Sequence, residues 1–170
     1  MTMLLIRALL PEVGLILVML YMVIMYRLCG LVADIALIGY VAIIALLLNG
    51  LDIQLTLPGI AGIILTIGTA VDANVVIFER IKEELKQDKS LRASVDAGFK
   101  RAFSAIIDSN ITTIIAAVVL WIFGTGTIIG FAKTLFMGTL VSMFTAIFVT
   151  RFLLRQLSIF GSKNSKFYSA

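Results

Sequence analysis

Residues 57–80 read LPGIAGIILTIGTAVDANVVIFER, an apolar stretch that carries one acid, Asp72, well inside it. Proline suits the first turn of a helix, so a helix is predicted to begin at Pro58. A rise of about 1.5 Å per residue places Asp72 about 21 Å from that end, within a hydrocarbon core of about 30 Å. A charged side chain at that depth costs at least about 2.5 kcal/mol, which makes this carboxylate a candidate functional site.

Small residues accompany the acid at helical spacing, and residues of this kind let a second helix approach closely. They are Gly62, Thr66, Gly68, Thr69 and Ala73. We therefore expect Asp72 to point into a helix bundle rather than at lipid. Two roles stay open, a permanently hydrogen-bonded acid that only holds helices together and an acid that carries protons. A carboxyl group kept from water favours its neutral form, which suits proton exchange at moderate pH and so favours the relay.

The composition is that of an integral membrane protein. Of the 170 residues 61% are hydrophobic and 14% charged, whereas about one quarter of a soluble domain is charged. Runs of about 20 apolar residues predict an all-α bundle of five transmembrane spans. The predicted spans cover about 9–26, 31–48, 57–79, 102–123 and 128–154, within a transmembrane domain of residues 13–155 that follows a junction (1–12) and precedes a polar cytoplasmic tail (156–170).

The long polar stretch 80–101 holds seven of the 14 basic residues. Its apolar positions recur at helical spacing, which predicts one or two amphipathic helices lying against the membrane face. Arg27 and the group from Arg151 to Lys166 fall on the same side, while the predicted loops 49–56 and 124–127 carry no basic residue. This asymmetry predicts an outer N-terminus and a cytoplasmic C-terminus. The net charge of +4 thus reflects orientation and does not indicate a nucleic-acid partner.

The span 102–123 contains a second acid, Asp108, about 9 Å from its inner end. Because the preceding span is antiparallel, Asp108 and Asp72 are predicted at similar depths and could share one hydrated pocket. The alternative is a structural ion pair between Asp108 and a loop cation such as Arg101. A third acid, Asp34, is expected in the first turn of its span, where a carboxylate favours the helix N-terminus.

The sequence lacks the residues or motifs required for metal binding, intramembrane aspartyl proteolysis and nucleotide binding. The chain has no histidine and one cysteine, Cys29, so no metal site and no cofactor is predicted. The segments TAVDANV and IIDSNIT around the two acids do not match the GxGD pattern of membrane aspartyl proteases. There is no Walker A sequence, and GTGTIIG (124–130) lacks the GxGxxG spacing and is interpreted as an outer turn. No enzymatic activity is predicted.

Four stretches taken together resemble a known family. They are LTLPGIAGIILTIGTAVDANVVIFERIKEEL (55–85), AGFKRAFSAIIDSNITTIIAA (97–117), GTGTIIGFAKTL (124–135) and SMFTAIFVTR (142–151). In this order they are similar to the membrane region of the SecD/SecF protein-export family, within the resistance-nodulation-division superfamily. The resemblance runs from about Gly14 to Arg155, while the opening MTMLLIRALLPEVG departs from it.

The resemblance implies that the five spans are the second to sixth of a six-helix half, without the first helix and the large periplasmic domains, as in a truncated or reduced protein. In that family SecD works with SecF at the bacterial inner membrane. Proton flow there helps to draw a translocating polypeptide from the SecYEG channel. Asp72 would be the proton-carrying acid facing charged residues of SecF, with supporting roles for Asn74, Asp108 and Asn110.

Two alternatives remain open at this stage. The first is a drug or lipid exporter half of the same superfamily. The second is a non-conducting assembly module in the membrane that keeps the helices without the periplasmic machinery.

Overall fold

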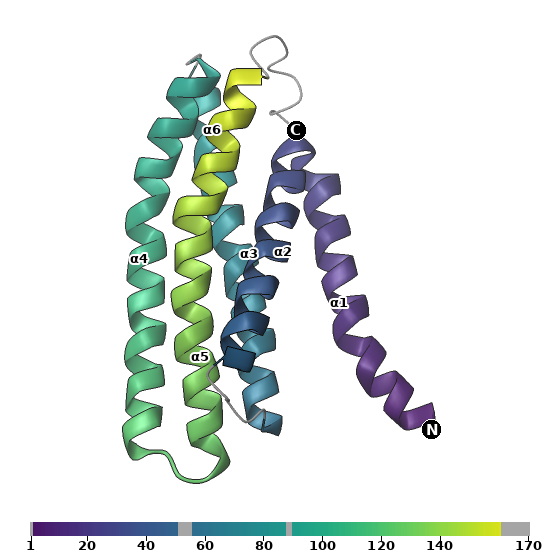
Figure 1. Cartoon of the computed structure of the whole chain (residues 1–170). Coiled ribbons are helices and arrows are strands. Elements are labelled where there is room, and N and C mark those ends of the chain that lie inside the picture. The colour runs from purple at the N-terminus through teal and green to yellow at the C-terminus, as the bar shows by residue number, and fades with distance from the viewer. Residues whose placement is uncertain (1, 51–55, 88–89, 161–170) are drawn as a thin grey trace.

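The computed structural model describes residues 2–50, 56–87 and 90–160, and within these ranges every element is a helix. The elements, shown in Figure 1, are α1 (Thr2–Tyr26), α2 (Leu28–Gly50), α3 (Leu57–Leu85), α4 (Leu91–Phe123), α5 (Thr127–Phe144), the π-helical segment η1 (Thr145–Thr150) and α6 (Arg151–Phe160). The predicted all-α class is confirmed.

Four stretches are long and apolar enough to cross a membrane: Cys29–Gly50, Leu57–Leu85, Leu91–Phe123 and Thr127–Gln156. The last of these joins α5, η1 and α6 into one continuous rod. The first predicted span is helical as well, and the part of it whose side chains the structure describes, Val13–Tyr26, is apolar. The chain is therefore a multi-pass transmembrane bundle, in which α1 is a further helix of 25 residues.

Several helix boundaries differ from the expected ones. α1 begins at Thr2, so the predicted junction is helical from that residue, and α6 continues to Phe160 through the start of the predicted tail. Asp34 was expected in the first turn of its span. α2 begins at Leu28, which places Asp34 beyond that first turn. Most of the predicted loop 49–56 and residues 161–170 of the tail lie outside the described residues.

The pattern of the polar stretch 80–101 predicted one or two amphipathic helices lying against the membrane face. That prediction was wrong, because the described part of the stretch forms no separate helix. Its first residues continue α3 to Leu85 and its last ones begin α4 at Leu91, so the two spans extend as one helical hairpin. The apolar positions Ile81, Val95 and Phe99 are buried in a single core cluster. The helices pack so closely that a Cβ on Gly98 would lie 2.7 Å from the Ile81 Cα. The apolar stripe therefore serves the contact between α3 and α4.

Local capping explains where these helices begin. The Thr56 hydroxyl accepts a hydrogen bond from the Gly59 amide at 3.2 Å, and Pro58 occupies the first turn of α3. The Ser90 hydroxyl accepts from the Ala93 amide at the start of α4. The glycine-rich turn between α4 and α5 contains Gly126 at φ 56°, a left-handed conformation that side chains rarely adopt.

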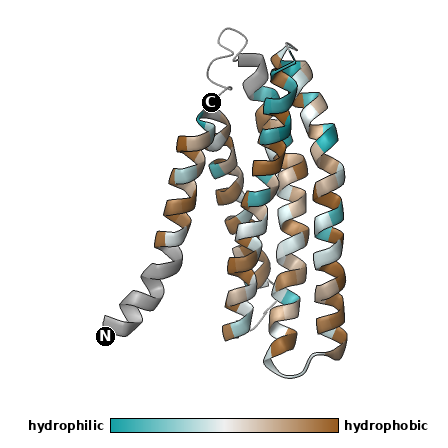
Figure 2. Cartoon of the chain, turned by 180° about the vertical axis from the view of Figure 1, so that it is seen from behind, coloured by the Kyte–Doolittle hydropathy of each residue, from teal (hydrophilic) through white to brown (hydrophobic). Residues whose placement is uncertain are grey.

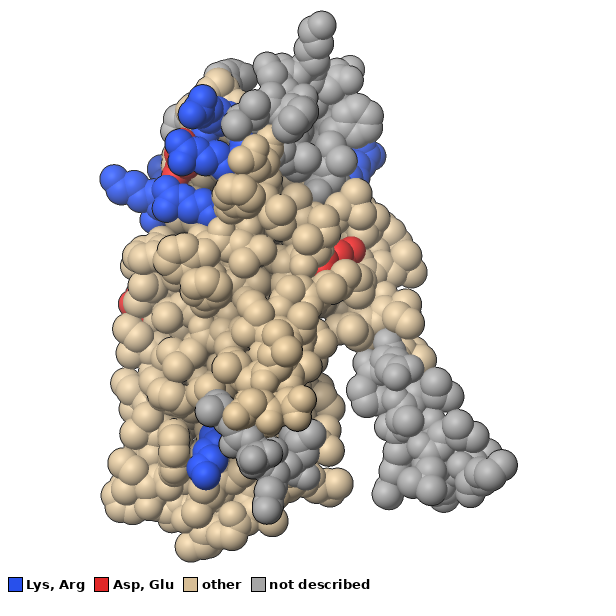
Figure 3. Space-filling model, viewed as in Figure 1, with Lys and Arg blue, Asp and Glu red and all other residues tan. Residues whose placement is uncertain are grey.

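Charge and hydropathy divide the bundle along its length. Many of the large hydrophobic side chains are exposed on the surface of the bundle. The helices are largely hydrophobic along their middle, and hydrophilic residues gather where α3 ends and α4 begins (Figure 2). Most visible Lys and Arg side chains cluster there as well (Figure 3). We call this the basic end, formed by residues 80–87 and 90–101 with Arg27, Arg151 and Arg155. The α4–α5 turn lies at the opposite end, and α1 leans away from the bundle toward its N-terminus (Figure 1).

Candidate functional site

The contact between α3 and α5 is built from small residues on both helices. A Cβ on Gly62 would lie 2.5 Å from the Thr134 Oγ1, and one on Gly138 would collide with Thr66. Thr66 and Ala73 are also buried on this side of α3, and Thr69 is half-buried. Backbones approach closely here because glycine faces threonine at these positions, with the Phe131 ring packed beside Gly62.

Asp72 does not lie on that contact face. Its side chain is exposed on the surface of this chain, and a Cβ added to Gly68, one turn earlier, would meet no atom within 4 Å. The expectation that Asp72 points into the bundle of this chain was therefore wrong. The reason is helical rotation, since successive residues are about 100° apart around the axis. A stripe that buries Ala73 turns Asp72 toward the outside.

Asn74, two residues beyond the acid, is buried and anchored to a distant part of the chain. Its Oδ1 accepts a hydrogen bond of 2.8 Å from the hydroxyl of Thr150, which is completely buried. Thr150 ends the π-helical segment η1. π-Helical turns occur often at functional sites, where the extra residue redirects side chains. The acid is thus linked, through Asn74, to an irregular turn of the C-terminal rod.

The second acid, Asp108, is also exposed, on α4. Asn110 is buried and donates to the Ile106 carbonyl at 2.7 Å, within its own helix. Arg101 forms an ion pair of 2.8 Å with the buried Glu84, so the alternative pairing of Asp108 with Arg101 was wrong. Since Asp72 and Asp108 are both exposed, neither is enclosed by this chain. Their shared pocket stays a prediction.

A further buried hydrogen bond was not foreseen. The Tyr40 hydroxyl donates to the Thr66 Oγ1 at 2.7 Å, and both residues are fully buried. Thr66 also touches the Gly138 position, so α2, α3 and α5 meet at this residue. A tyrosine within an apolar span is the signal that was available, because a buried phenol generally finds a hydrogen-bond partner.

Asp34 is the other acid that the structure reassigns. It is 8% exposed, and within the described part of the chain its Oδ1 has no hydrogen-bond partner. Its burial follows from the position of α2, which packs against α1 on one side and against α3 and η1 on another. Among the described residues no group of three or more His, Cys, Asp or Glu side chains could hold a metal ion.

Long apolar helices, joined through glycine and threonine contacts and carrying an exposed acid within one span, define a polytopic helical membrane protein. The family described as "Protein export membrane protein SecD/SecF, C-terminal" matches residues 5–159. The chain belongs to this SecD/SecF family.

Individual relatives agree with this assignment. The chain is 58% identical, over 91% of its length, to a protein translocase subunit SecD of Acidaminococcus fermentans. It is also 58% identical, over 85% of its length, to the SecD subunit of Dictyoglomus turgidum. In each case it spans 36% of the relative, about a third of that protein's length.

A solved structure shows the same fold. The crystal structure of SecDF from Thermus thermophilus, described as a translocon-associated membrane protein, matches 89% of this chain with a TM-score of 0.86 and 42% identity. The match covers 21% of the SecDF chain. The helical bundle described above is therefore the arrangement found in a membrane region of that larger protein.

Proposed function

We propose that this chain is the membrane-embedded part of a Sec protein-export subunit of the bacterial inner membrane, with Asp72 as its proton-carrying acid. The observation that carries the proposal is the position of Asp72, exposed within an apolar span of a SecD/SecF family member. The family relation points to SecF, the SecYEG translocon and a translocating polypeptide as partners. No catalytic reaction is assigned to the chain.

The face that presents Asp72 needs a cover. Ile64 and Leu65, about two turns earlier on α3, are about half exposed, and Gly68 leaves an open step one turn away. A carboxylate directed at lipid would cost several kcal/mol, so a protein surface is the favourable neighbour. The open step at Gly68 permits close approach of a partner helix. SecF fits this role because the two subunits of the family work as a pair.

Proton uptake by Asp72 would then act on packing. Neutralising the acid changes its interaction with the partner surface, and α3 transmits that change to Asn74. Asn74 holds η1 through Thr150, so the C-terminal rod is the element positioned to respond. Such a response could move a domain attached to the bundle, which is the step that links proton flow to polypeptide movement.

The test replaces Asp72 by Asn in the full-length subunit together with SecF. Export into membrane vesicles is measured with and without a proton-motive force. We expect Asp72→Asn to abolish the part of export that depends on the proton-motive force, and Asp72→Glu to retain some of it. Glu83→Gln, an exposed acid at the basic end of the same helix, serves as the matched control and should leave export unchanged.

Co-purification with SecF separates failed assembly from failed proton transfer. If Asp72→Asn still binds SecF and export keeps its full dependence on the proton-motive force, the relay is refuted. That outcome would favour the assembly module, which needs the helices but no titrating acid.

A further inference from the structure

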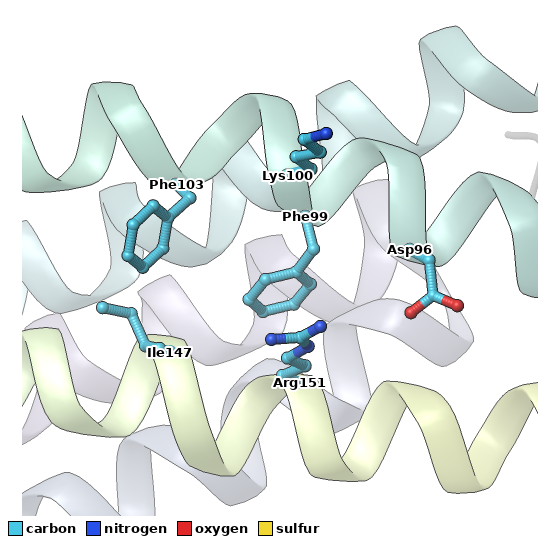
Figure 4. A pocket seen from close by; sticks show the side chains of 6 residues that line it. All are labelled: Asp96, Phe99, Lys100, Phe103, Ile147 and Arg151. Atoms are coloured by element: carbon cyan, nitrogen blue, oxygen red, sulfur yellow. The ribbon is translucent and has the colours of Figure 1, made fainter.

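A cavity of about 310 Å³ lies at the basic end of the bundle. Its lining residues come from α4, η1 and α6, whereas Asp72 lies on α3. The cavity lies between α4 and the rod formed by η1 and α6. Its lining, shown in Figure 4, consists of Asp96, Phe99, Lys100, Phe103, Ile147 and Arg151. A second cavity adjoins it, sharing Ile147 and Arg151 and adding Phe148, Phe152 and Arg155. None of these residues has a part in the proton relay proposed above.

The cavity is polar at one end and apolar at the other. Asp96 lies on one side of the central Phe99–Arg151 pair, and Phe103 and Ile147 lie on the other side (Figure 4). Phe103 lies seven positions after Asp96 on α4, a rise of about 10 Å along the helix axis. Phe103 lies toward the middle of the span and Asp96 toward the polar hairpin tip, so the polarity follows the direction from membrane to water.

Arg151 is held in place at the centre. Its guanidinium carbon lies 5.7 Å from the centre of the Phe99 ring, within the range of a cation–π contact. Lys100 follows Phe99 directly on α4 and borders the same space, although its ammonium points away from Arg151 (Figure 4). Two cations from two different helices and one acid, Asp96, therefore border a cavity whose other lining residues are aromatic and aliphatic.

This combination matches the chemistry of a phospholipid rather than that of a soluble anion. A soluble phosphate would gain nothing from contact with the apolar side chains of Phe103 and Ile147, or with the exposed Phe148 and Phe152 next to them. Acyl chains do, because burying apolar surface is favourable. Basic pockets between transmembrane helices at a membrane face are known to receive anionic headgroups.

We propose that this cavity binds an anionic glycerophospholipid, phosphatidylglycerol, with its phosphate on Arg151, its acyl chains along Phe103 and Ile147, and the exposed Lys100 side chain turned toward the headgroup. The two cations outnumber the one acid, so the cavity favours a lipid with net negative charge over a zwitterionic one. Asp96 then accepts hydrogen bonds from the headgroup glycerol hydroxyls. The bound lipid bridges α4 and the C-terminal rod.

The experiment uses the full chain in nanodiscs of equal parts phosphatidylglycerol and phosphatidylethanolamine with matched acyl chains. The protein is extracted in mild detergent, and retained lipid is identified and counted by native mass spectrometry. We expect selective retention of one phosphatidylglycerol. Lys100→Gln and Arg151→Gln should each lower that retention about fivefold, because each cation near a lipid surface contributes about 1 kcal/mol to binding.

Arg92→Gln is the matched control, since Arg92 is exposed on the same helix but lines neither cavity. It should leave retention unchanged, and unaltered thermal unfolding of all variants would show that they fold. Equal losses from Arg92→Gln and Lys100→Gln would mean diffuse attraction and would overturn the site. Equal retention of the two lipids, with a loss on Asp96→Asn, would also overturn it in favour of a zwitterionic headgroup whose ammonium binds Asp96.

Discussion

Asp72 and Asn74 show how two neighbouring polar residues of one helix acquire opposite environments. Asp72 is exposed on this chain, whereas Asn74 is buried against Thr150. The sequence predicted that both matter, through the resemblance and through the unusual acid. Which of them faces a partner could not be predicted, because it depends on the rotation of α3 that its contact with α5 imposes.

The bond between Thr150 and Asn74 can be measured by a double-mutant cycle. Asn74→Ala and Thr150→Val should each destabilise the bundle, with a coupling free energy of about 0.6 kcal/mol and at most about 1.7 kcal/mol, the range for hydrogen bonds between membrane helices. Thr150→Ser keeps the hydroxyl and serves as the control. The measurement is reversible unfolding in bicelles. A coupling of zero would show that the bond contributes nothing to stability.

At the scale of helices, the hairpin of α3 and α4 is the clearest departure from the predicted arrangement. Its apolar stripe and its charges are compatible with a helix on the membrane surface as well as with two helices that pack on each other. The ion pair between Arg101 and the buried Glu84 and the contact of Gly98 with Ile81 decide for the hairpin. Both are long-range contacts that local periodicity does not contain.

Gly98→Ala tests this contact. The added methyl would lie 2.7 Å from Ile81 backbone atoms, which a rotamer change cannot relieve, so we expect a loss of about 1–3 kcal/mol in unfolding free energy. Gly68→Ala is the matched control on α3, where no atom lies within 4 Å. Alanine favours helix there, so stability should be unchanged or higher. Equal destabilisation by both substitutions would contradict the close packing of the hairpin.

At the scale of the whole molecule, the bundle separates a basic end from an end that holds the α4–α5 turn. The positive-inside rule predicts that the basic end faces the cytoplasm. Single cysteines at the exposed positions Gln87 and Thr125 can test this in a Cys29→Ala background. A membrane-impermeant maleimide should label Thr125→Cys from outside and Gln87→Cys only after permeabilisation. The reverse pattern would invert the proposed topology.

Assembly provides a second prediction at this scale. If SecF covers the Asp72 face, Gly68→Leu should fill the open step and reduce co-purification with SecF severalfold, while the chain alone keeps its stability. Gly39→Leu is a comparison at another helical glycine with open space around it. Unchanged SecF binding by Gly68→Leu would place the partner on a different face.

The sequence by itself determined the helical class, the order of the apolar helices, the polarity of the two ends and the family. These follow from side-chain hydropathy, which acts residue by residue along the chain, and from the motifs that the family shares. Only the tertiary structure decided that Asp72 turns outward, that Asn74 binds Thr150, and that Arg101 pairs with Glu84. The sequence of a helix specifies which residues lie on each of its faces. Contacts with other helices then determine which of those faces is buried.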